Sequence, residues 1–280
     1  MKLLTSIWSS YYQDQTPEEM VDRFAEAGWC ATEFSDEHGA VLLERAKERG
    51  VSPSVVGEEL RCYAESNGVT FPQGHLLLGV DLCADNAEEL LTPWLELFVS
   101  LGIRAAVLHP SCRQENFTPE QRFARWAEVL RHLTSQLEGT DMSIALENAG
   151  GVLLSADKLL GLIDAVGSSH LGICLDTGHL NRDRNIVNCT QGEFIRLAGD
   201  RLIALHINDN DASRDQHLMP FGMGNVDFND VMRALRDIGY RGLFNLEIPG
   251  ERRAPLHLRR AKLDYLKIVC DTMLRDEFAE

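Results

Sequence analysis

The chain has 280 residues, 44% of them hydrophobic and 25% charged, a composition close to the globular average that excludes disordered and collagen-like architectures. Its length suits one large domain, such as an α/β barrel of about 250 residues. Because 27 Lys and Arg stand against 43 Asp and Glu, the net charge of −16 repels a phosphate backbone and disfavours nucleic acid as a partner.

Predicted strands and helices alternate along the chain, with a short apolar run always preceding a longer segment of helical spacing. Two helix starts carry a Thr N-cap, a Pro at the next position and a Glu or Gln at the third helical position, at Thr16–Glu19 and Thr118–Gln121. The apolar stripe from Trp126 to Leu137 is predicted to face a sheet. The predicted strands are Lys2–Trp8, Cys30–Phe34, Gly68–His75, Ile103–His109, Met142–Glu147, His170–Asp176, Leu202–Asn208 and Gly242–Glu247.

The order of these elements predicts the fold class. A helix between each pair of consecutive strands requires parallel strands and right-handed crossovers. Eight such units close most simply into a (β/α)8 barrel, with a doubly wound open sheet as the alternative. No stretch has the composition of a linker, so we predict a single α/β domain over residues 1–280.

The cellular compartment is predicted from the N-terminal residues, the length of the apolar runs and the spacing of the cysteines. Met1 to Trp8 contains no apolar stretch of signal-peptide length, and no later run approaches the roughly 18 apolar residues that span a bilayer. We therefore expect no membrane association and a cytoplasmic location. The seven cysteines are odd in number and never spaced Cys-x-x-Cys, so we expect reduced, mostly buried thiols.

Polar residues stand where the predicted strands end, which is where (β/α)8 barrels carry their catalytic groups. Gathering several carboxylates and imidazoles in one cavity is unfavourable unless a positive charge compensates them, and a divalent metal is the simplest such charge. Mixed carboxylate and imidazole ligands suit Mn, Mg, Co or Zn. These strand-end residues, from the third strand to the eighth, are His75, His109, Glu147, Asp176 with His179, His206 and Glu247.

The loop after the seventh strand adds two potential ligands, Asp215 and His217. They are two residues apart, so both reach the pocket only if the backbone twists between them, and we expect Gly222 and Gly224 to permit that twist. Trp8 could stack on a sugar face or fill the barrel core. Histidines before strands or within helices are interpreted as structural, namely His38, His132, His170 and His257.

Four motifs, taken together, resemble the xylose isomerase-like TIM-barrel superfamily, also called AP endonuclease family 2. They are Leu146–Gly151, Cys174–His179, His206–Asp209 and Leu246–Glu247. The resemblance covers about Gly68 to Gly250, and the first two strands contribute no distinctive residues. In the ketose 3-epimerases and sugar isomerases of this superfamily, strands five to eight hold one divalent metal. The resemblance implies Glu147, Asp176, His206 and Glu247 as its ligands, the two glutamates as the catalytic acid/base pair, and His179 as a contact to a substrate oxygen.

The endonuclease IV branch of the superfamily uses three metals, and the same resemblance offers ligands for further zinc ions at His75, His109, His179, Asp215 and His217. The loops that would face DNA argue against this branch. An acidic run, Ser35–Gly39, follows the second strand, and Leu78 occupies the position where the nuclease pattern has a Tyr. These loops therefore lack the basic residues that grip a DNA backbone and the aromatic residues that wedge into a duplex.

The predicted function is therefore a sugar isomerase or epimerase that depends on one divalent metal and works through an enediolate. A related lyase or dehydratase acting on a keto-sugar, and a multi-zinc phosphodiesterase, are the alternatives. A non-catalytic carbohydrate-binding barrel would leave the clustered carboxylates unexplained. The expected partner is a small sugar rather than nucleic acid or a membrane, and homo-oligomer formation is left open.

Overall fold

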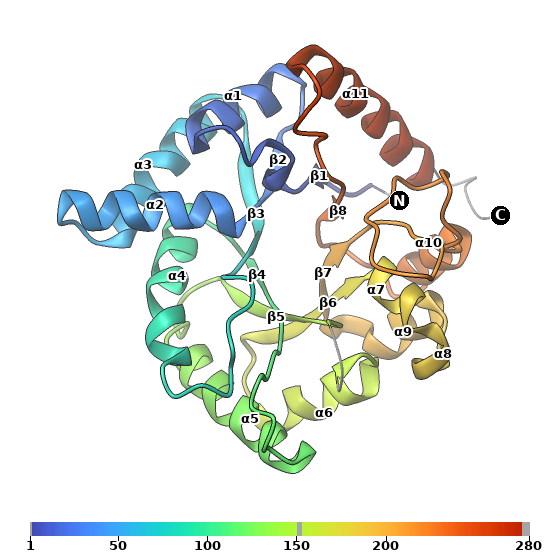
Figure 1. Ribbon diagram of the computed structural model, residues 1–280. Coiled ribbons are helices and arrows are strands. Elements are labelled where there is room, and N and C mark those ends of the chain that lie inside the picture. Colours follow the sequence, from blue (N-terminus) through green and yellow to red (C-terminus); the bar gives the residue numbers. More distant parts are fainter. Residues whose placement is uncertain (1, 150–152, 276–280) are drawn as a thin grey trace.

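The structure is a computed structural model and describes residues 2–149 and 153–275. Within them, eight strands stand in the centre and helices form a ring around them (Figure 1). The strands are β1 (Thr5–Ile7), β2 (Ala31–Phe34), β3 (Thr70–His75), β4 (Ala105–Leu108), β5 (Ser143–Glu147), β6 (Leu171–Asp176), β7 (Leu202–His206) and β8 (Phe244–Leu246).

The strands close into a parallel barrel. Strands β2 to β7 pair in chain order, and β1 pairs with β8. Single parallel bridges complete the circle, Trp8 with Glu33 between β1 and β2, and Ile207 with Leu246 between β7 and β8. The predicted (β/α)8 barrel is confirmed, and the open sheet is excluded because both edges of the six-stranded sheet meet the β1–β8 pair.

Each predicted strand is present and is shorter than predicted. The difference matters at the C-terminal ends, where His109 and Glu247 lie one residue beyond β4 and β8. The backbone there leaves the sheet to enter a loop, so these side chains stand at the rim of the barrel.

The helices lie around the barrel, and two of them begin where the sequence predicts a helix start. Thr16 caps α1 in a reciprocal capping box with Glu19, and Thr118 caps α5 in the same way with Gln121, as predicted. The helices are α1 (Pro17–Glu26), α2 (Asp36–Arg49), α3 (Pro53–Ser66), α4 (Ala87–Leu101), α5 (Pro119–Ser135), α6 (Ala156–Val166), α7 (Thr177–Arg182), α8 (Arg184–Val187), α9 (Gln191–Ala198), α10 (Phe228–Asp237) and α11 (Leu256–Met273).

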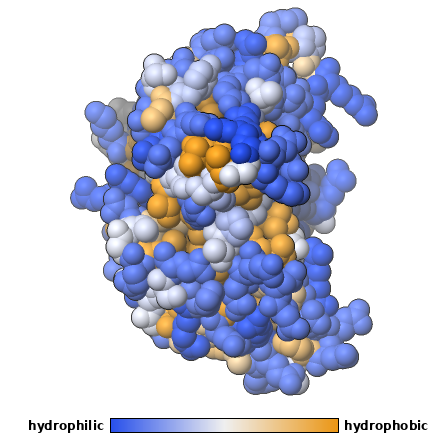
Figure 2. Space-filling model, turned by 90° about the vertical axis from the view of Figure 1, so that its left-hand side faces the viewer, coloured by the Kyte–Doolittle hydropathy of each residue, from blue (hydrophilic) through white to orange (hydrophobic). Residues whose placement is uncertain are grey.

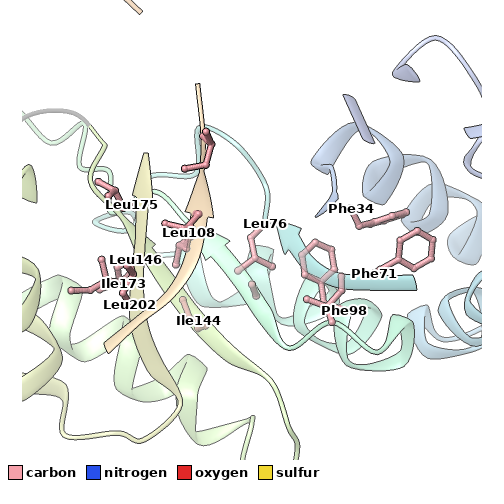
Figure 3. Close-up of a cluster of buried hydrophobic side chains, with 14 of the residues drawn as sticks. Phe34, Phe71, Leu76, Phe98, Leu108, Ile144, Leu146, Ile173, Leu175 and Leu202 are labelled. Atoms are coloured by element: carbon pink, nitrogen blue, oxygen red, sulfur yellow. The ribbon is translucent and has the colours of Figure 1, made fainter. Parts of the chain in front are cut away.

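The core has two parts because side chains alternate along each strand. Large side chains on the outer face of the barrel, such as Leu146, Ile173 and Leu175, belong to the cluster shared with the helices (Figure 3). The predicted stripe from Trp126 to Leu137 is buried in the same cluster. Smaller side chains form a separate cluster inside the barrel, namely Ala105, Val107, Ala145, Cys174 and Ala204.

All seven cysteines lie in the described part of the chain and are free. The expectation that most are buried was wrong, because only Cys83, Cys174 and Cys270 are buried, whereas Cys30 and Cys62 are exposed. In residues 2–149 and 153–275, no helix combines the length and apolar character needed to cross a bilayer. Hydrophilic residues cover most of the face shown in Figure 2, and apolar residues gather in a hollow across its middle.

Candidate active site

The predicted strand-end residues meet at one end of the barrel, with Glu147 at their centre. This side chain is 1% exposed. Its Oε2 lies 3.0 Å from His109 Nε2, 3.2 Å from His206 Nδ1 and 3.6 Å from His75 Nε2. Its Oε1 lies 2.9 Å from His179 Nδ1. One buried carboxylate therefore contacts imidazoles that come from β3, β7, α7 and the residue after β4.

Strand geometry explains this convergence. Three small residues that point into the barrel are each followed, two positions later, by a candidate ligand. Because the side-chain period of a strand is two, the ligand shares the inward direction of the small residue before it. These pairs are Ala145 and Glu147, Cys174 and Asp176, and Ala204 and His206.

A second part of the cluster joins the loop after β7 to the same centre. His206 Nδ1 and His217 Nδ1 each lie 3.4 Å from Glu247 Oε2. Asp215 bridges two imidazoles, with Oδ1 3.2 Å from His217 Nε2 and Oδ2 3.0 Å from His179 Nε2. The carboxylates and imidazoles predicted as ligands thus form one continuous network.

The loop after β7 reaches the cluster in a way that differs from the prediction. The backbone twist lies at His217 itself, whose φ is 46°. Gly222 and Gly224 have no positive φ, so the expectation that they supply the twist was wrong. Gly224 is needed for a different reason, since the Asp209 carboxylate occupies the space that a Cβ there would need.

Asp176 is held by hydrogen bonds that fix its carboxylate. The His179 backbone N–H donates to Oδ1 at 2.6 Å, which makes Asp176 the N-cap of α7. Asn208 Nδ2 donates to Oδ2 at 2.7 Å and also lies 3.4 Å from Glu247 Oε2. Asn208 therefore sets the orientation of two candidate ligands.

The two glutamates experience different local charges. Burial opposes ionisation of Glu147, but the imidazoles of His109 and His206 outweigh it and hold the pKa well below its usual value. Burial raises the pKa of Glu247 to about 8, against the lowering effect of His206 and His217.

The residues fit a bound cation. Glu147 Oε1 and His206 Nδ1 are buried and make no hydrogen bond within the described part of the chain, although they lie close to other candidate ligand atoms. Buried polar atoms without partners are unfavourable, and a cation among them removes that penalty. Ligand atoms within 4.8 Å of one another form overlapping groups, which include His75–His109–Glu147, Glu147–Asp176–His179 and His179–Asp215–His217.

Outer hydrogen bonds also prepare the imidazoles for metal binding. His75 Nδ1 lies 2.7 Å from the Leu76 carbonyl oxygen, and His217 Nδ1 lies 3.1 Å from the Glu247 carbonyl oxygen. A carbonyl can only accept, so in each ring Nδ1 carries a proton and Nε2 is the nitrogen that faces the cluster, where it would bind a cation after loss of any proton it carries.

Sequence reasoning missed a buried network beneath His206, which involves the first two strands although these contribute no distinctive residues to the family resemblance. Glu33 on β2 accepts a hydrogen bond from His206 Nε2 at 2.9 Å and another from Asn245 Nδ2. Ser6 on β1 donates to Asn245 Oδ1 at 2.7 Å. A proton on Nε2 leaves Nδ1 of His206 free to face the glutamates. The signal for this network in the sequence was the carboxylate of Glu33, which lies within the otherwise uncharged strand that ends at Phe34.

Replacing Glu33 by glutamine tests this network. The amide places an N–H₂ group against one of two donors, His206 Nε2 or Asn245 Nδ2, and its neutral oxygen accepts more weakly than a carboxylate, so His206 is held less firmly. We expect metal affinity to fall by about 10–100-fold with the fold retained, as measured by calorimetric titration and circular dichroism. Exposed Glu48 on α2 provides the matched control, Glu48→Gln. Equal metal affinities in both variants would contradict a role for Glu33.

Trp8 lies at the rim of the site. Its ring stacks on that of His217, with centroids 5.8 Å apart and an angle of 7° between the planes, and its Nε1 donates to the Ile248 carbonyl at 3.0 Å. Its contact with a sugar stays a prediction. His38 is buried outside the cluster and bonds to Ser9 and Ser35, in agreement with a structural role. The predicted motif residues Gly150 and Gly151 lie outside the described residues.

Comparison with known proteins identifies the family. The sequence profile described as "Xylose isomerase-like TIM barrel" matches residues 21–269. The chain belongs to this family. The uncharacterized protein y4fM of Sinorhizobium fredii is 30% identical over 271 residues, which are 86% of this chain and 84% of that protein.

Proteins similar to this chain include enzymes named for reactions of sugars. The D-psicose 3-epimerase of Enterocloster bolteae is 30% identical over 206 residues, covering 68% of this chain and 65% of that enzyme. The crystal structure of D-psicose 3-epimerase from Clostridium cellulolyticum H10 superposes with a TM-score of 0.77 over 98% of this chain and 100% of that chain. At 17% identity, this structural likeness supports the barrel fold alone.

The nuclease branch also matches, over a shorter segment. The probable endonuclease 4 of Mycobacterium leprae is 26% identical over 162 residues, which are 55% of this chain and 61% of that protein.

Proposed function

We propose that this protein is a divalent-metal-dependent isomerase or epimerase of a small sugar or sugar derivative. One observation carries the proposal. Two buried glutamates, Glu147 and Glu247, lie 3.2 and 3.4 Å from the same His206 nitrogen, which makes no hydrogen bond. Similarity to D-psicose 3-epimerase over 68% of the chain supports the choice of substrate class.

The metal ligands in this proposal are Glu147, Asp176, His206 and Glu247. When bound, a divalent cation supplies Lewis-acid stabilisation for the negative charge that develops on the sugar oxygens. The chain contributes the orientation of these ligands, through Asn208 under Asp176 and Glu33 under His206.

The two glutamates also move the proton. One carboxylate removes the proton from the carbon beside the sugar carbonyl, which leaves an enediolate. Return of a proton by the other carboxylate to the opposite face inverts that carbon, and return to the neighbouring carbon gives isomerisation. Loss of a leaving group from the same enediolate would give a lyase or dehydratase instead. The near-complete burial of both side chains limits the access of bulk water during the transfer.

His179 is proposed to bind a substrate oxygen. It lies between Glu147 and Asp215, and its side chain remains 10% exposed, whereas that of Glu147 is 1% exposed. Its position beside the catalytic carboxylate, with some access to solvent, suits a group that meets the substrate as it enters.

A screen for products tests the proposed reaction. The protein is loaded with Mn, Mg, Co or Zn and incubated with keto-sugars, and the sugars are then followed by nuclear magnetic resonance. We expect a new epimer or aldose isomer that forms only with metal. Product formation that is unchanged after complete chelation would overturn metal dependence.

A specific observation favours a second candidate, a multi-zinc phosphodiesterase. His75 and His109 lie with Glu147, and Asp215 and His217 lie with His179, so ligand groups exist beyond the single-metal set. Such adjoining groups could hold further zinc ions, and endonuclease 4 sequences match 55% of the chain. The number of bound metals distinguishes the candidates, since about one ion per chain favours the isomerase and about three favour the phosphodiesterase.

The proposed absence of DNA binding gives a direct prediction. Asp36 and Glu37 begin α2 beside the loop after β3, where the Leu78 backbone donates to Asp36 Oδ2 at 3.2 Å. With this acidic rim and a net charge of −16, few phosphates can be neutralised and little counterion release drives binding. We expect no binding or nicking of an abasic duplex by the zinc-loaded protein at physiological salt, measured by gel shift and strand cleavage. Efficient nicking would reverse the order of the two candidates.

The setting proposed for this enzyme is the cytoplasm. Seven free cysteines are typical of a reducing compartment, where disulfides are rare. Its proposed partner is the sugar itself, and formation of a homo-oligomer is left to measurement.

A further inference from the structure

Two thiols and a carboxylate meet outside the candidate active site, between the loops that follow β3 and β4. The sulfur atoms of Cys83 and Cys112 and a carboxylate oxygen of Asp81 all lie within 4.8 Å of one another. Cys83 is 4% exposed, and the other two residues are half-buried. The predicted metal ligands and acid/base groups include none of these residues.

Backbone and side-chain hydrogen bonds fix this arrangement. Asp81 Oδ1 accepts from the Cys83 N–H at 2.9 Å, and Oδ2 accepts from Gln114 Nε2 at 3.1 Å. The Leu82 N–H donates to the Ser111 carbonyl at 3.1 Å, which joins the two loops directly. Each carboxylate oxygen keeps a second lone pair. The hydrogen bonds therefore hold the carboxylate in place and leave it able to bind a cation.

Two chemistries are open to a pair of neighbouring thiols, disulfide formation and metal binding. Burial raises the pKa of the Cys83 thiol to about 12, and the Cys112 thiol and the Asp81 carboxylate add to this effect. A thiol that stays protonated is a poor nucleophile, which disfavours thiol–disulfide exchange at this position. A thiophilic cation can still bind because it displaces the proton from each thiol as it binds.

We propose that Asp81, Cys83 and Cys112 form a separate binding site for a thiophilic divalent cation such as zinc. Thiolate ligands select zinc or cadmium over magnesium or manganese, so this site differs in metal preference from the carboxylate–imidazole cluster. Binding releases two thiol protons and leaves two thiolates and one carboxylate around the cation. The proposal does not depend on the reaction proposed above.

Such a site would have a structural consequence for the barrel rim. The loop that contains Cys83 begins after His75, and the loop that contains Cys112 begins at His109. A cation held by both loops would therefore fix the segments that follow two imidazoles of the candidate active site.

Cadmium titration of the reduced, full-length protein tests the proposal, because thiolate-to-cadmium charge transfer absorbs in the ultraviolet whereas carboxylate and imidazole ligands give no such band. We expect the wild-type band to saturate at about one thiolate-bound cadmium per chain. Cys83→Ser and Cys112→Ser should each lose most of the band. Asp81→Asn keeps both thiols and should weaken cadmium binding by about tenfold or more, since losing even an outer partner of a metal site has such an effect.

Two cysteines serve as controls. Cys62 is exposed on α3, and Cys174 is buried in the candidate active site, where it lies with Glu147 and His206. Cys62→Ser and Cys174→Ala should keep the band at full strength. A band lost in Cys174→Ala but kept in Cys83→Ser would overturn the proposal, as would the absence of a band in reduced wild-type protein. A Cys83–Cys112 disulfide found by mass spectrometry of freshly purified protein, together with no cadmium band after reduction, would assign this pair to redox chemistry instead.

Discussion

Glu147→Gln is expected to lower kcat by about 10²–10⁴-fold, the usual contribution of a positioned acid or base, and to reduce metal content as well. The reason is that Glu147 is the centre of the site, in contact with four imidazoles from β3, β7, α7 and the loop after β4. Glutamine keeps the size of the side chain but loses its charge, so it neither accepts a proton nor balances a cation. Product formation by nuclear magnetic resonance and metal content by elemental analysis measure the two effects.

Glu247→Gln should behave in the same way, because the second carboxylate is needed to return the proton. Exposed Glu138 after α5 supplies the matched control, and Glu138→Gln should keep full activity and metal content. Circular dichroism should show the same fold in all three variants. Full activity of both site variants in the presence of a chelator would refute the assignment of these glutamates as metal ligands and proton carriers.

His179→Ala is the second variant for which a large effect is expected, with turnover reduced by about 10²-fold or more and metal content unchanged. If His179 positions a substrate oxygen, the lost interaction is made to the substrate and the transition state and not to the metal. Steady-state kinetics and elemental analysis of the same preparation give both quantities. Restored turnover in His179→Gln, which keeps a hydrogen-bonding group, would support this role further.

The same measurement on His217→Ala separates one-metal from multi-metal chemistry. His179 and His217 share Asp215 as a partner, at 3.0 and 3.2 Å. In a one-metal isomerase neither substitution removes metal. If either variant loses metal in proportion to activity, the one-metal isomerase is wrong and a multi-metal site replaces it.

The sequence was sufficient for the barrel because the signals that specify it are local. Thr16 and Glu19 lie three residues apart, and their capping box forms within one helical turn. The inward direction of the strand-end residues could also be predicted from the sequence. Glu147 follows Ala145, and Asp176 follows Cys174, at the two-residue period of a strand. Placement of candidate ligands at successive strand ends therefore predicted which side chains would meet.

The network beneath the site could not be predicted because its contacts are non-local. Glu33 and His206 are separated by 173 positions and come together only when the barrel closes. Asn245 and Ser6 are separated by 239 positions, and no periodicity links them. The positive φ of His217 could not be predicted for another reason, since a left-handed backbone is uncommon for any residue other than glycine and two glycines follow nearby.

The central claim, proton transfer beside a sugar carbonyl by Glu147 and Glu247, is tested most directly by deuterium uptake from solvent. Metal-loaded protein is incubated in deuterium oxide with a panel of keto-sugars, and the recovered sugars are analysed by mass spectrometry and nuclear magnetic resonance. We predict incorporation of deuterium at a carbon adjacent to the carbonyl for at least one sugar, with none in Glu147→Gln or in chelated protein. Absence of exchange with every sugar, together with phosphodiester cleavage by protein that holds about three zinc ions, would contradict it.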